Sequence, residues 1–227
     1  MCCIGVLLYC KNTIEQNLNL LQRYKDFIKA ENLFSSKDKL VLAVSGGVDS
    51  VVLCELCHQA GFDFMIVHCN FQLRGEESER DEKFVRQLGE KYKVEVTVKK
   101  FNTEQYAAEK KISIQVAARE LRYEWFQGLI GNMQYAIGRE GTQKKNTDCS
   151  LPGANCYLLT AHHANDNIET LLMNFFRGTG LEGLRGIPEK VKEKKLIRPL
   201  LHFKREEIEA FAKENNLQWV EDSSNES

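Results

Sequence analysis

One short stretch of the sequence combines glycine, hydroxyl and carboxylate side chains where an apolar run gives way to a helical pattern. It reads Ser45-Gly46-Gly47-Val48-Asp49-Ser50 and continues directly from the β-type run of residues 39–45. Two glycines allow a backbone to turn tightly and to approach a ligand closely. The unpaired N–H groups at the start of the following helix attract anions, and the two serines add hydroxyl donors. The stretch therefore predicts a phosphate-binding loop.

Asp49 is the unusual member of this loop, because its carboxylate would repel a bare phosphate. A metal ion held jointly by the carboxylate and the phosphates, such as Mg²⁺, removes that conflict. The loop lacks the lysine of a Walker sequence and does not follow the G-x-G-x-x-G spacing. The alternative is a tight strand–helix turn in which Asp49 and Ser50 only cap the helix.

A second polar set lies on a helix that the sequence predicts over residues 163–176. At about 100° per residue, His162, Asp166 and Glu169 fall on one arc of this helix. An imidazole beside two carboxylates can hold Mg²⁺, bind an ammonium group or take a proton from an amine. The alternatives are a solvated polar face and a purely structural hydrogen bond from His162 or His163. The opposite arc is apolar, which predicts packing on a sheet, and carries Ile168, Leu171, Leu172, Phe175 and Phe176.

Strand-like and helix-like segments alternate along the rest of the chain. Strands are expected at residues 39–45, 62–69, 93–101 and 156–161, with a fifth ending within 198–201. Helices are expected at 13–34, 50–60, 76–92, 113–130, 163–176 and 204–216. This order predicts an α/β fold: a doubly wound, mainly parallel five-stranded sheet with helices on both faces. Ligands of such sheets bind beyond the carboxyl ends of the strands, where both polar sets fall.

Composition narrows the function classes. The 31 Lys and Arg residues nearly balance 32 Asp and Glu residues, so the net charge of −1 argues against a domain that is basic throughout. A local basic face remains compatible with this balance. No run approaches the roughly 18 apolar residues of a membrane span. The 8 cysteines are scattered, which predicts reduced thiols and a cytoplasmic protein. We expect the C-x-x-C pair, Cys54 and Cys57, to be buried apolar residues.

The Ser45–Ser50 stretch resembles the SGGxDS signature of the PP-loop ATP pyrophosphatases. Members of that superfamily grip the β,γ-pyrophosphate of ATP, which implies adenylation of a substrate with release of pyrophosphate. Further motifs follow in the order found in the tRNA(Ile)-lysidine synthetase family, which the sequence resembles from about residue 39 onward. They are His68-x-Asn70-x-x-Leu73-Arg74-Gly75-Glu76-Glu77-Ser78, Ala118-Arg119-x-x-Arg122-Tyr123, residues 160–170, Arg177-Gly178-Thr179-Gly180-Leu181, Arg198-Pro199-Leu200-Leu201 and Trp219-x-Glu221-Asp222-x-Ser224-Asn225.

This resemblance implies ATP-dependent ligation of free L-lysine to C2 of the wobble cytidine in tRNA(Ile) with a CAU anticodon. The reaction runs through an adenylated cytidine and releases AMP and pyrophosphate. ATP and Mg²⁺ are the implied cofactors, no membrane is involved, and a homodimer is compatible. Two alternatives are another PP-loop adenylating enzyme, of the tRNA thiolase, NAD synthetase or GMP synthetase type, and a non-catalytic ATP-binding module.

Site roles are expected as follows. Catalysis is expected from Asp49, Asp166 and Glu169, with Asp49 also the metal ligand. Asn165 stands where the family usually has a first aspartate, so it carries no catalytic role here. ATP is expected on Ser45, Gly46, Gly47, Val48, Asp49 and Ser50, with His68 and Asn70. The substrates are expected on Arg74, Arg119, Arg122, His162 and Arg177.

The expected organisation is an N-terminal extension and helix over residues 1–38, followed by the ATP-binding catalytic domain over 39–227. Residues 138–155 form an inserted loop in this prediction, because they are polar and separate a helix from a strand. The C-terminal tRNA-binding part of the family is expected to be absent from this sequence. The basic run at residues 190–195 is a candidate for contact with the tRNA backbone, and its alternative is a solvated face.

Overall fold

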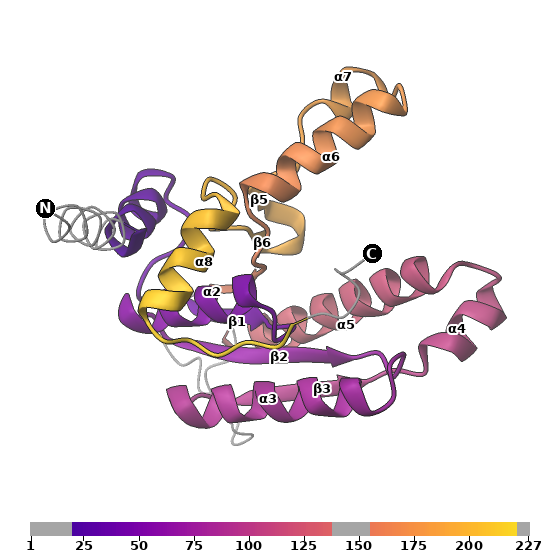
Figure 1. Ribbon diagram of the computed structural model, residues 1–227, viewed down its shortest axis with the longest axis horizontal. Helices are drawn as coiled ribbons and strands as arrows, with labels where there is room; N and C mark the ends of the chain where they lie inside the picture. Colours follow the sequence, from indigo (N-terminus) through magenta and orange to yellow (C-terminus); the bar gives the residue numbers. More distant parts are fainter. Residues whose placement is uncertain (1–19, 138–154, 222–227) are drawn as a thin grey trace, which may run out of the picture.

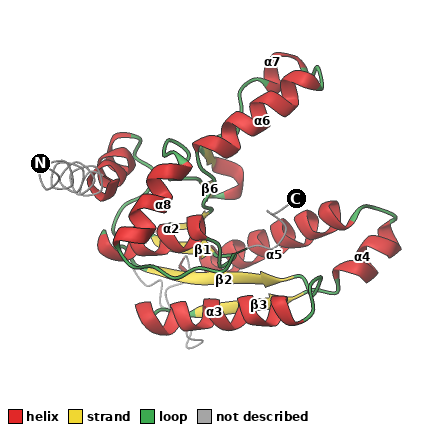
Figure 2. Cartoon of the chain, in the orientation of Figure 1, coloured by secondary structure: helices red, strands yellow, loops and turns green. Residues whose placement is uncertain are grey.

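A single sheet organises the computed structural model, which describes residues 20–137 and 155–221 (Figures 1 and 2). The sheet has six strands in the order β3-β2-β1-β4-β6-β5. All neighbouring pairs are parallel except β5 with β6, which is antiparallel. The strands are β1 (Lys39–Ala43), β2 (Phe64–Asn70), β3 (Val96–Lys100), β4 (Cys156–Leu159), β5 (Lys190–Val191) and β6 (Leu196–Ile197). The predicted α/β fold with a mainly parallel sheet is confirmed.

The predicted count of five strands is wrong, and so is the position of the last one. The parallel strand beside β4 is β6, which ends before residues 198–201. The basic connection that precedes it contributes β5, which turns back onto β6 through a short 3₁₀ helix, η1 (Lys192–Lys194). Strands of two residues are too short to show a period-2 pattern, so the sequence did not reveal them.

Helices cover both faces of the sheet, as the alternation predicted. A helix over residues 20–30 shares one core with the first face, together with α2 (Val48–Gln59), α3 (Glu76–Tyr92) and α8 (Arg205–Glu214). The other face is covered by α5 (Ile114–Ile137), whose Phe126, Ile130 and Met133 pack against β1, β2, β4 and β6. A further helix, α4 (Thr103–Lys110), lies beside α5 and was not predicted.

The boundaries proposed from the sequence stay predictions. Residues 1–19 and the inserted loop lie outside the described residues, except for Asn155. Asn155 accepts a bond from the N–H of Lys39 and so adjoins the start of β1. In the helix over residues 20–30, Leu20, Tyr24 and Ile28 are buried in the core that covers the first face of the sheet.

The C-x-x-C pair is structural, as expected. Cys54 and Cys57 are free thiols with no exposed surface on α2. The hydroxyl of Tyr24 lies 3.2 Å from the Cys57 sulfur. Burial raises the pKa of Cys57 to about 12, so the thiol stays protonated and unreactive near neutral pH. Within the described part of the chain, no helix is both long enough and apolar enough to cross a membrane.

The expected packing of the helix after β4 is wrong. That helix, α6 (Ala164–Phe176), has no buried residue and projects away from the sheet with α7 (Gly180–Gly183) at its tip (Figure 1). Phe175 is 65 % exposed and Phe176 is 81 % exposed. The amphipathic pattern identified the apolar face correctly, but periodicity carries no information on what a face meets. Here α6 leaves the sheet edge instead of folding back along it.

This difference predicts opposite results for two phenylalanine truncations. Phe126→Ala should lower the free energy of unfolding by about 3–5 kcal/mol, because Phe126 is 3 % exposed in the core under α5. Phe176→Ala should change the same free energy by less than about 0.5 kcal/mol, because its side chain packs on almost nothing. Urea unfolding followed by circular dichroism measures both values. Equal destabilisation by the two variants would show that α6 packs on the body of the protein.

Candidate active site

The turn between β1 and α2 has the geometry of an anion-binding loop. Gly46 is buried with a φ of +106°, a conformation that side-chain-bearing residues rarely adopt. Ser50 fixes the turn, since its hydroxyl donates to the Gly47 carbonyl at 2.8 Å and accepts from the Gly46 N–H at 3.3 Å. No side chain caps the start of α2 at Gly47. The first N–H groups of α2 are therefore available to an anion.

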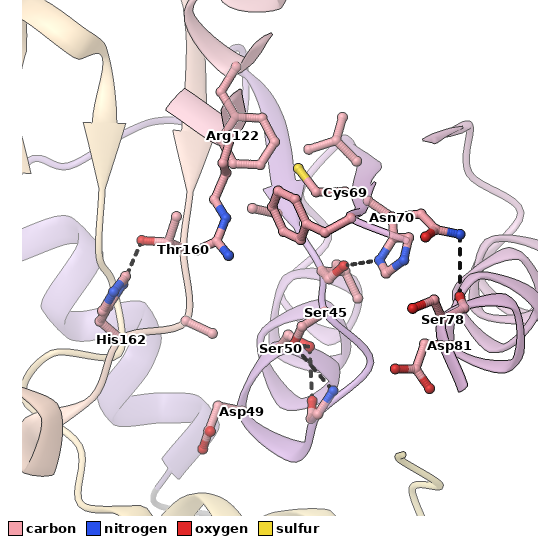
Figure 3. Close-up of a pocket in the computed structure, with 18 of the residues that line it drawn as sticks. Ser45, Asp49, Ser50, Cys69, Asn70, Ser78, Asp81, Arg122, Thr160 and His162 are labelled. Carbon is pink, nitrogen blue, oxygen red and sulfur yellow. Dashed lines mark hydrogen bonds between the residues drawn. The ribbon is translucent and has the colours of Figure 1, made fainter. Parts of the chain in front are cut away.

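This loop opens into a cavity of about 500 Å³ at the carboxyl ends of the strands (Figure 3). Residues that follow β1, β2 and β4 line it, and α5 closes one side. The structure brings most of the sequence-predicted residues to this cavity. Those that line it are Ser45, Gly47, Asp49, Ser50, His68, Asn70, Arg74, Arg122, His162 and Asp166.

The remaining predicted residues lie outside the lining. Gly46 and Val48 are buried in the loop itself. Arg119 is exposed on α5, Glu169 is exposed on α6, and Arg177 is exposed at the end of α6. The structure thus brings Asp166 to the phosphate loop and leaves Glu169 one turn further along α6. The roles expected for Arg119, Glu169 and Arg177 stay predictions.

His163 joins the two polar sets that the sequence predicted separately. Its ring is 4 % exposed and lies between Asp49 and Asp166, with Nε2 3.7 Å from Asp49 Oδ1. Nδ1 accepts the Asp166 N–H at 3.3 Å, while the Asp166 carboxylate accepts the His163 N–H at 2.8 Å. This reciprocal capping box starts α6. Because Nδ1 accepts, a neutral ring carries its proton on Nε2, which faces Asp49.

The sequence left open whether His162 or His163 has a structural role. The structure assigns the capping role to His163, and the three-residue spacing to Asp166 is the signal that could have identified it. His162 instead lines the cavity, and its Nδ1 lies 3.0 Å from the Thr160 hydroxyl. Burial and the nearby Arg198 lower the pKa of His162 despite Asp166, so its ring is neutral near pH 7.

One carboxylate oxygen of Asp49 lacks a hydrogen-bond partner. Its Oδ1 is buried and has no hydrogen-bond partner. Burial raises the pKa of Asp49, although His163 and Arg205 oppose the shift. A buried carboxylate oxygen without a partner favours an incoming cation. This observation fits the predicted Mg²⁺ ion at Asp49.

The residues around Asp49 suit a metal ion that binds together with the phosphates of a substrate. Among residues 20–137 and 155–221, no group of three or more His, Cys, Asp or Glu residues is arranged to hold a metal ion. Mg²⁺ is commonly bound by one or two carboxylates together with substrate phosphates and water. Asp49, with Asp166 on the other side of His163, supplies that kind of incomplete set.

His68 and Asn70 support the cavity by holding its strands in place. His68 Nδ1 lies 2.8 Å from the Val44 carbonyl, and burial lowers the pKa of His68. Asn70 donates to the Glu82 carboxylate at 3.0 Å and accepts from the Gln72 N–H at 3.0 Å. These bonds tie the exits of β1 and β2 to each other and to α3. Both residues line the cavity, and their contact with ATP stays a prediction.

Comparison with known proteins assigns the family. A PP-loop domain model matches residues 15–137 and 147–227. The chain belongs to the PP-loop domain family. It is 45 % identical over 204 residues to a tRNA(Ile)-lysidine synthase of Bacteroides thetaiotaomicron, covering 90 % of this chain and 43 % of that protein. A tRNA(Ile)-lysidine synthase of Chlorobaculum tepidum is 35 % identical over 209 residues, covering 90 % of this chain and 56 % of the relative. This PP-loop chain thus spans about half of each relative's length.

Solved structures agree with the fold. A U34-tRNA thiolase, NcsA, from Methanococcus maripaludis with its [4Fe-4S] cluster matches with a TM-score of 0.65 at 15 % identity. The match covers 91 % of this chain and 67 % of the thiolase. An NMN synthetase from Francisella tularensis matches with a TM-score of 0.53 at 14 % identity, covering 91 % of this chain and 71 % of the other. At this identity the likeness shows the PP-loop fold alone.

The phosphate loop predicts different costs for substitution of its two glycines. Gly46→Ala should lower the free energy of unfolding by about 1–3 kcal/mol, because alanine is strained at a positive φ. Gly47→Ala is the matched control, since Gly47 has a φ of −69° and the nearest atom to an added Cβ is the Ser45 hydroxyl at 3.6 Å. It should change stability by less than about 0.5 kcal/mol. Thermal unfolding measures both variants, and a Gly46→Ala protein as stable as the parent contradicts the loop geometry.

Proposed function

We propose that this chain carries the catalytic domain of an ATP-dependent ligase that joins L-lysine to C2 of the wobble cytidine of tRNA(Ile). One observation carries the proposal: the anion-binding loop and the Asp49–His163–Asp166 set converge on one cavity. The chain's identity of 45 % to a named tRNA(Ile)-lysidine synthase supports this choice among PP-loop enzymes. A cytoplasmic location and a homodimer stay predictions.

The loop has the first task, which is to hold the β- and γ-phosphates of ATP. The N–H groups at the start of α2 donate to the phosphate oxygens, and the Ser45 hydroxyl, exposed beside them, adds a donor. Mg²⁺ would be held by Asp49 with Asp166 nearby, and it would neutralise charge on the pyrophosphate leaving group. The α-phosphate is then left facing the cavity, where O2 of the cytidine attacks it and pyrophosphate departs.

The cavity has the second task, which is to receive the target base. A wobble base must leave the anticodon stack to reach a reacting phosphate inside a protein. A volume of about 500 Å³ is within the usual range for small-molecule sites. Phe71 lines this space, and the Arg122 guanidinium lies 5.2 Å from its ring centroid. An aromatic ring and a guanidinium plane are both surfaces on which a nucleobase stacks.

The polar end of α6 has the third task, which is to deliver the lysine amine. The ε-amine has a reference pKa of about 10.4, so it must lose a proton before it attacks C2 and displaces AMP. The neutral ring of His162 and the carboxylate of Asp166 both line the cavity and accept protons. Glu169, exposed one turn further along the helix, would attract the ammonium group as it enters.

The other PP-loop chemistries are less consistent with the cysteines. Cys54 and Cys57 are buried within the core and cannot reach the cavity. Cys69 lines the cavity, but burial raises its pKa to about 12 despite Arg122 and Lys99. A thiol of that pKa is a poor nucleophile near neutral pH.

The direct test uses a protein that contains this chain within the full length of its relatives. It is incubated with ATP, Mg²⁺, L-lysine and a tRNA(Ile) transcript with a CAU anticodon, and the digested nucleosides are analysed by mass spectrometry. We expect one cytidine to gain a lysine, only when lysine and ATP are both present. Pyrophosphate release with a different group added to the tRNA, or with none, would contradict the proposal.

Asp166→Asn tests the role of the α6 carboxylate. The amide oxygen can still accept the His163 N–H, so the helix cap remains while the charge is lost. We expect the rate of lysidine formation to fall by about 100-fold or more, the usual loss for a proton-transfer group. Asp63→Asn is the matched control, because Asp63 is an exposed carboxylate paired with Lys39. An Asp166→Asn protein with the parent rate would remove Asp166 from the mechanism.

A further inference from the structure

Several cations gather around one tyrosine beside the cavity. The Arg119 guanidinium lies 5.3 Å from the centroid of the Tyr123 ring, and the Lys194 ammonium lies 5.4 Å from it. Arg198 also lies near Tyr123, because burial lowers the pKa of the Arg198 guanidinium while the neighbouring Tyr123 opposes that shift. We call Arg119, Tyr123, Lys194 and Arg198 the Tyr123 cluster. It joins α5, η1 and the residue after β6, three elements that are distant in the sequence.

The positive charges of the cluster have no ion pair with a carboxylate among the described residues. Some other arginines and lysines have a carboxylate partner, for example Arg23 with Glu207 and Lys91 with Glu55. Within residues 20–137 and 155–221, no carboxylate forms an ion pair with any of the three cations of the cluster. Three like charges around one ring repel one another, so the arrangement favours an anionic partner.

Arg198 is the buried member of the cluster, and its side chain is held in a fixed position. It is 7 % exposed, and its Nε is buried without a hydrogen-bond partner. One terminal nitrogen donates to the Pro188 carbonyl, which holds the side chain in place. Burying an arginine with an unpaired donor is costly unless something else satisfies it. Arg119 and Lys194 are exposed, so a ligand can approach the cluster from solvent.

The position of the cluster relates it to the cavity. Tyr123 lines the cavity, and Arg198 directly follows β6, which lies two strands from β1 in the sheet. Two strand spacings are about 10 Å, so the cluster is clearly separate from the phosphate loop after β1. A ligand that reaches both places must extend across the carboxyl edge of the sheet.

We propose that the Tyr123 cluster binds a backbone phosphate of the tRNA, next to the nucleotide whose base enters the cavity. The identity of the nucleic acid rests on the proposed function, while the anionic ligand class rests on the cluster itself. Phosphodiester oxygens accept the paired donors of a guanidinium, and such contacts fix the register of a nucleic acid on a protein. The cluster is thus a positioning site: it places the wobble base by holding the chain beside it.

The test is the salt dependence of tRNA binding to the chain. Fluorescence anisotropy of a labelled tRNA(Ile) transcript gives the association constant at a series of KCl concentrations. Each lost phosphate contact reduces the slope of log K against log salt by about 0.7–0.9. Arg119→Gln combined with Lys194→Gln removes the exposed cations that hold this one phosphate, so it should flatten the slope by about 0.7–0.9. Both residues are exposed, so the double variant should fold like the parent.

Arg23→Gln combined with Lys91→Gln is the matched control, because it removes the same two charges from the opposite face of the sheet. It should leave the slope unchanged. The proposed phosphate subsite is contradicted if the slope is unchanged in the cluster variant or changes equally in both variants. It is also contradicted if the parent chain does not bind tRNA.

A second measurement separates the cluster from the amino-acid site, whose α-carboxylate is also an anion. Calorimetric titration with L-lysine should give the same affinity for the parent and for the cluster variant. Loss of lysine affinity with an unchanged salt slope assigns the cluster to the amino acid and overturns the proposal. The two proposals also fail separately. A tRNA bound with the expected slopes but never modified contradicts only the ligase, whereas lysidine formation with unchanged slopes contradicts only the subsite.

Discussion

The backbone conformation of Gly46 is the constraint on which the site depends. At a φ of +106° the chain leaves β1 and enters α2 within four residues, which points the first N–H groups of α2 into the cavity. The space around Gly46 is filled from two distant segments, since Phe84 of α3 and Val220 near the C-terminus both lie within 3.6 Å of where its Cβ would be. Val220 also donates its N–H to the Gly46 carbonyl at 3.0 Å. The loop conformation is therefore held by the tertiary structure as well as by its own turn.

His163 transmits this placement to the second half of the site. The same ring caps α6 through Nδ1 and faces the loop carboxylate through Nε2, so α6 starts at a fixed position relative to α2. Asp166 completes the cap and lines the cavity at once. Because the helix cap already restricts the rotamers of Asp166, its side chain loses less conformational entropy when a ligand binds. The exposed remainder of α6 has no such restraint, because none of its residues is buried.

The sequence predicted the elements whose signals are local. The phosphate loop, its position between β1 and α2, and α3 over residues 76–92 follow from glycines, caps and periodicity within single segments. The packing of α6, the hairpin of β5 and β6, and the Tyr123 cluster depend on contacts between segments distant in sequence, and no local pattern encodes them. His163 is intermediate, because a capping histidine and a ligand histidine have the same residue type and neighbours. The three-residue spacing to Asp166 indicates its capping role, whereas its 3.7 Å approach to Asp49 depends on the fold.

A near-neutral net charge is compatible with a nucleic-acid substrate when the ion pairs between charged side chains are considered. A net charge of −1 describes the whole chain, but the field at a site depends on which charges are compensated. On the face formed by α2, α3 and α8, several arginines are paired with neighbouring carboxylates, as Arg86 is with Glu82 and Arg205 with Glu209. On the α5 side, Arg119, Lys194 and Arg198 lie around the ring of Tyr123 instead. Because paired charges largely cancel beyond a Debye length of about 8 Å, a close group of uncompensated cations can attract a polyanion even when the net charge of the chain is near zero.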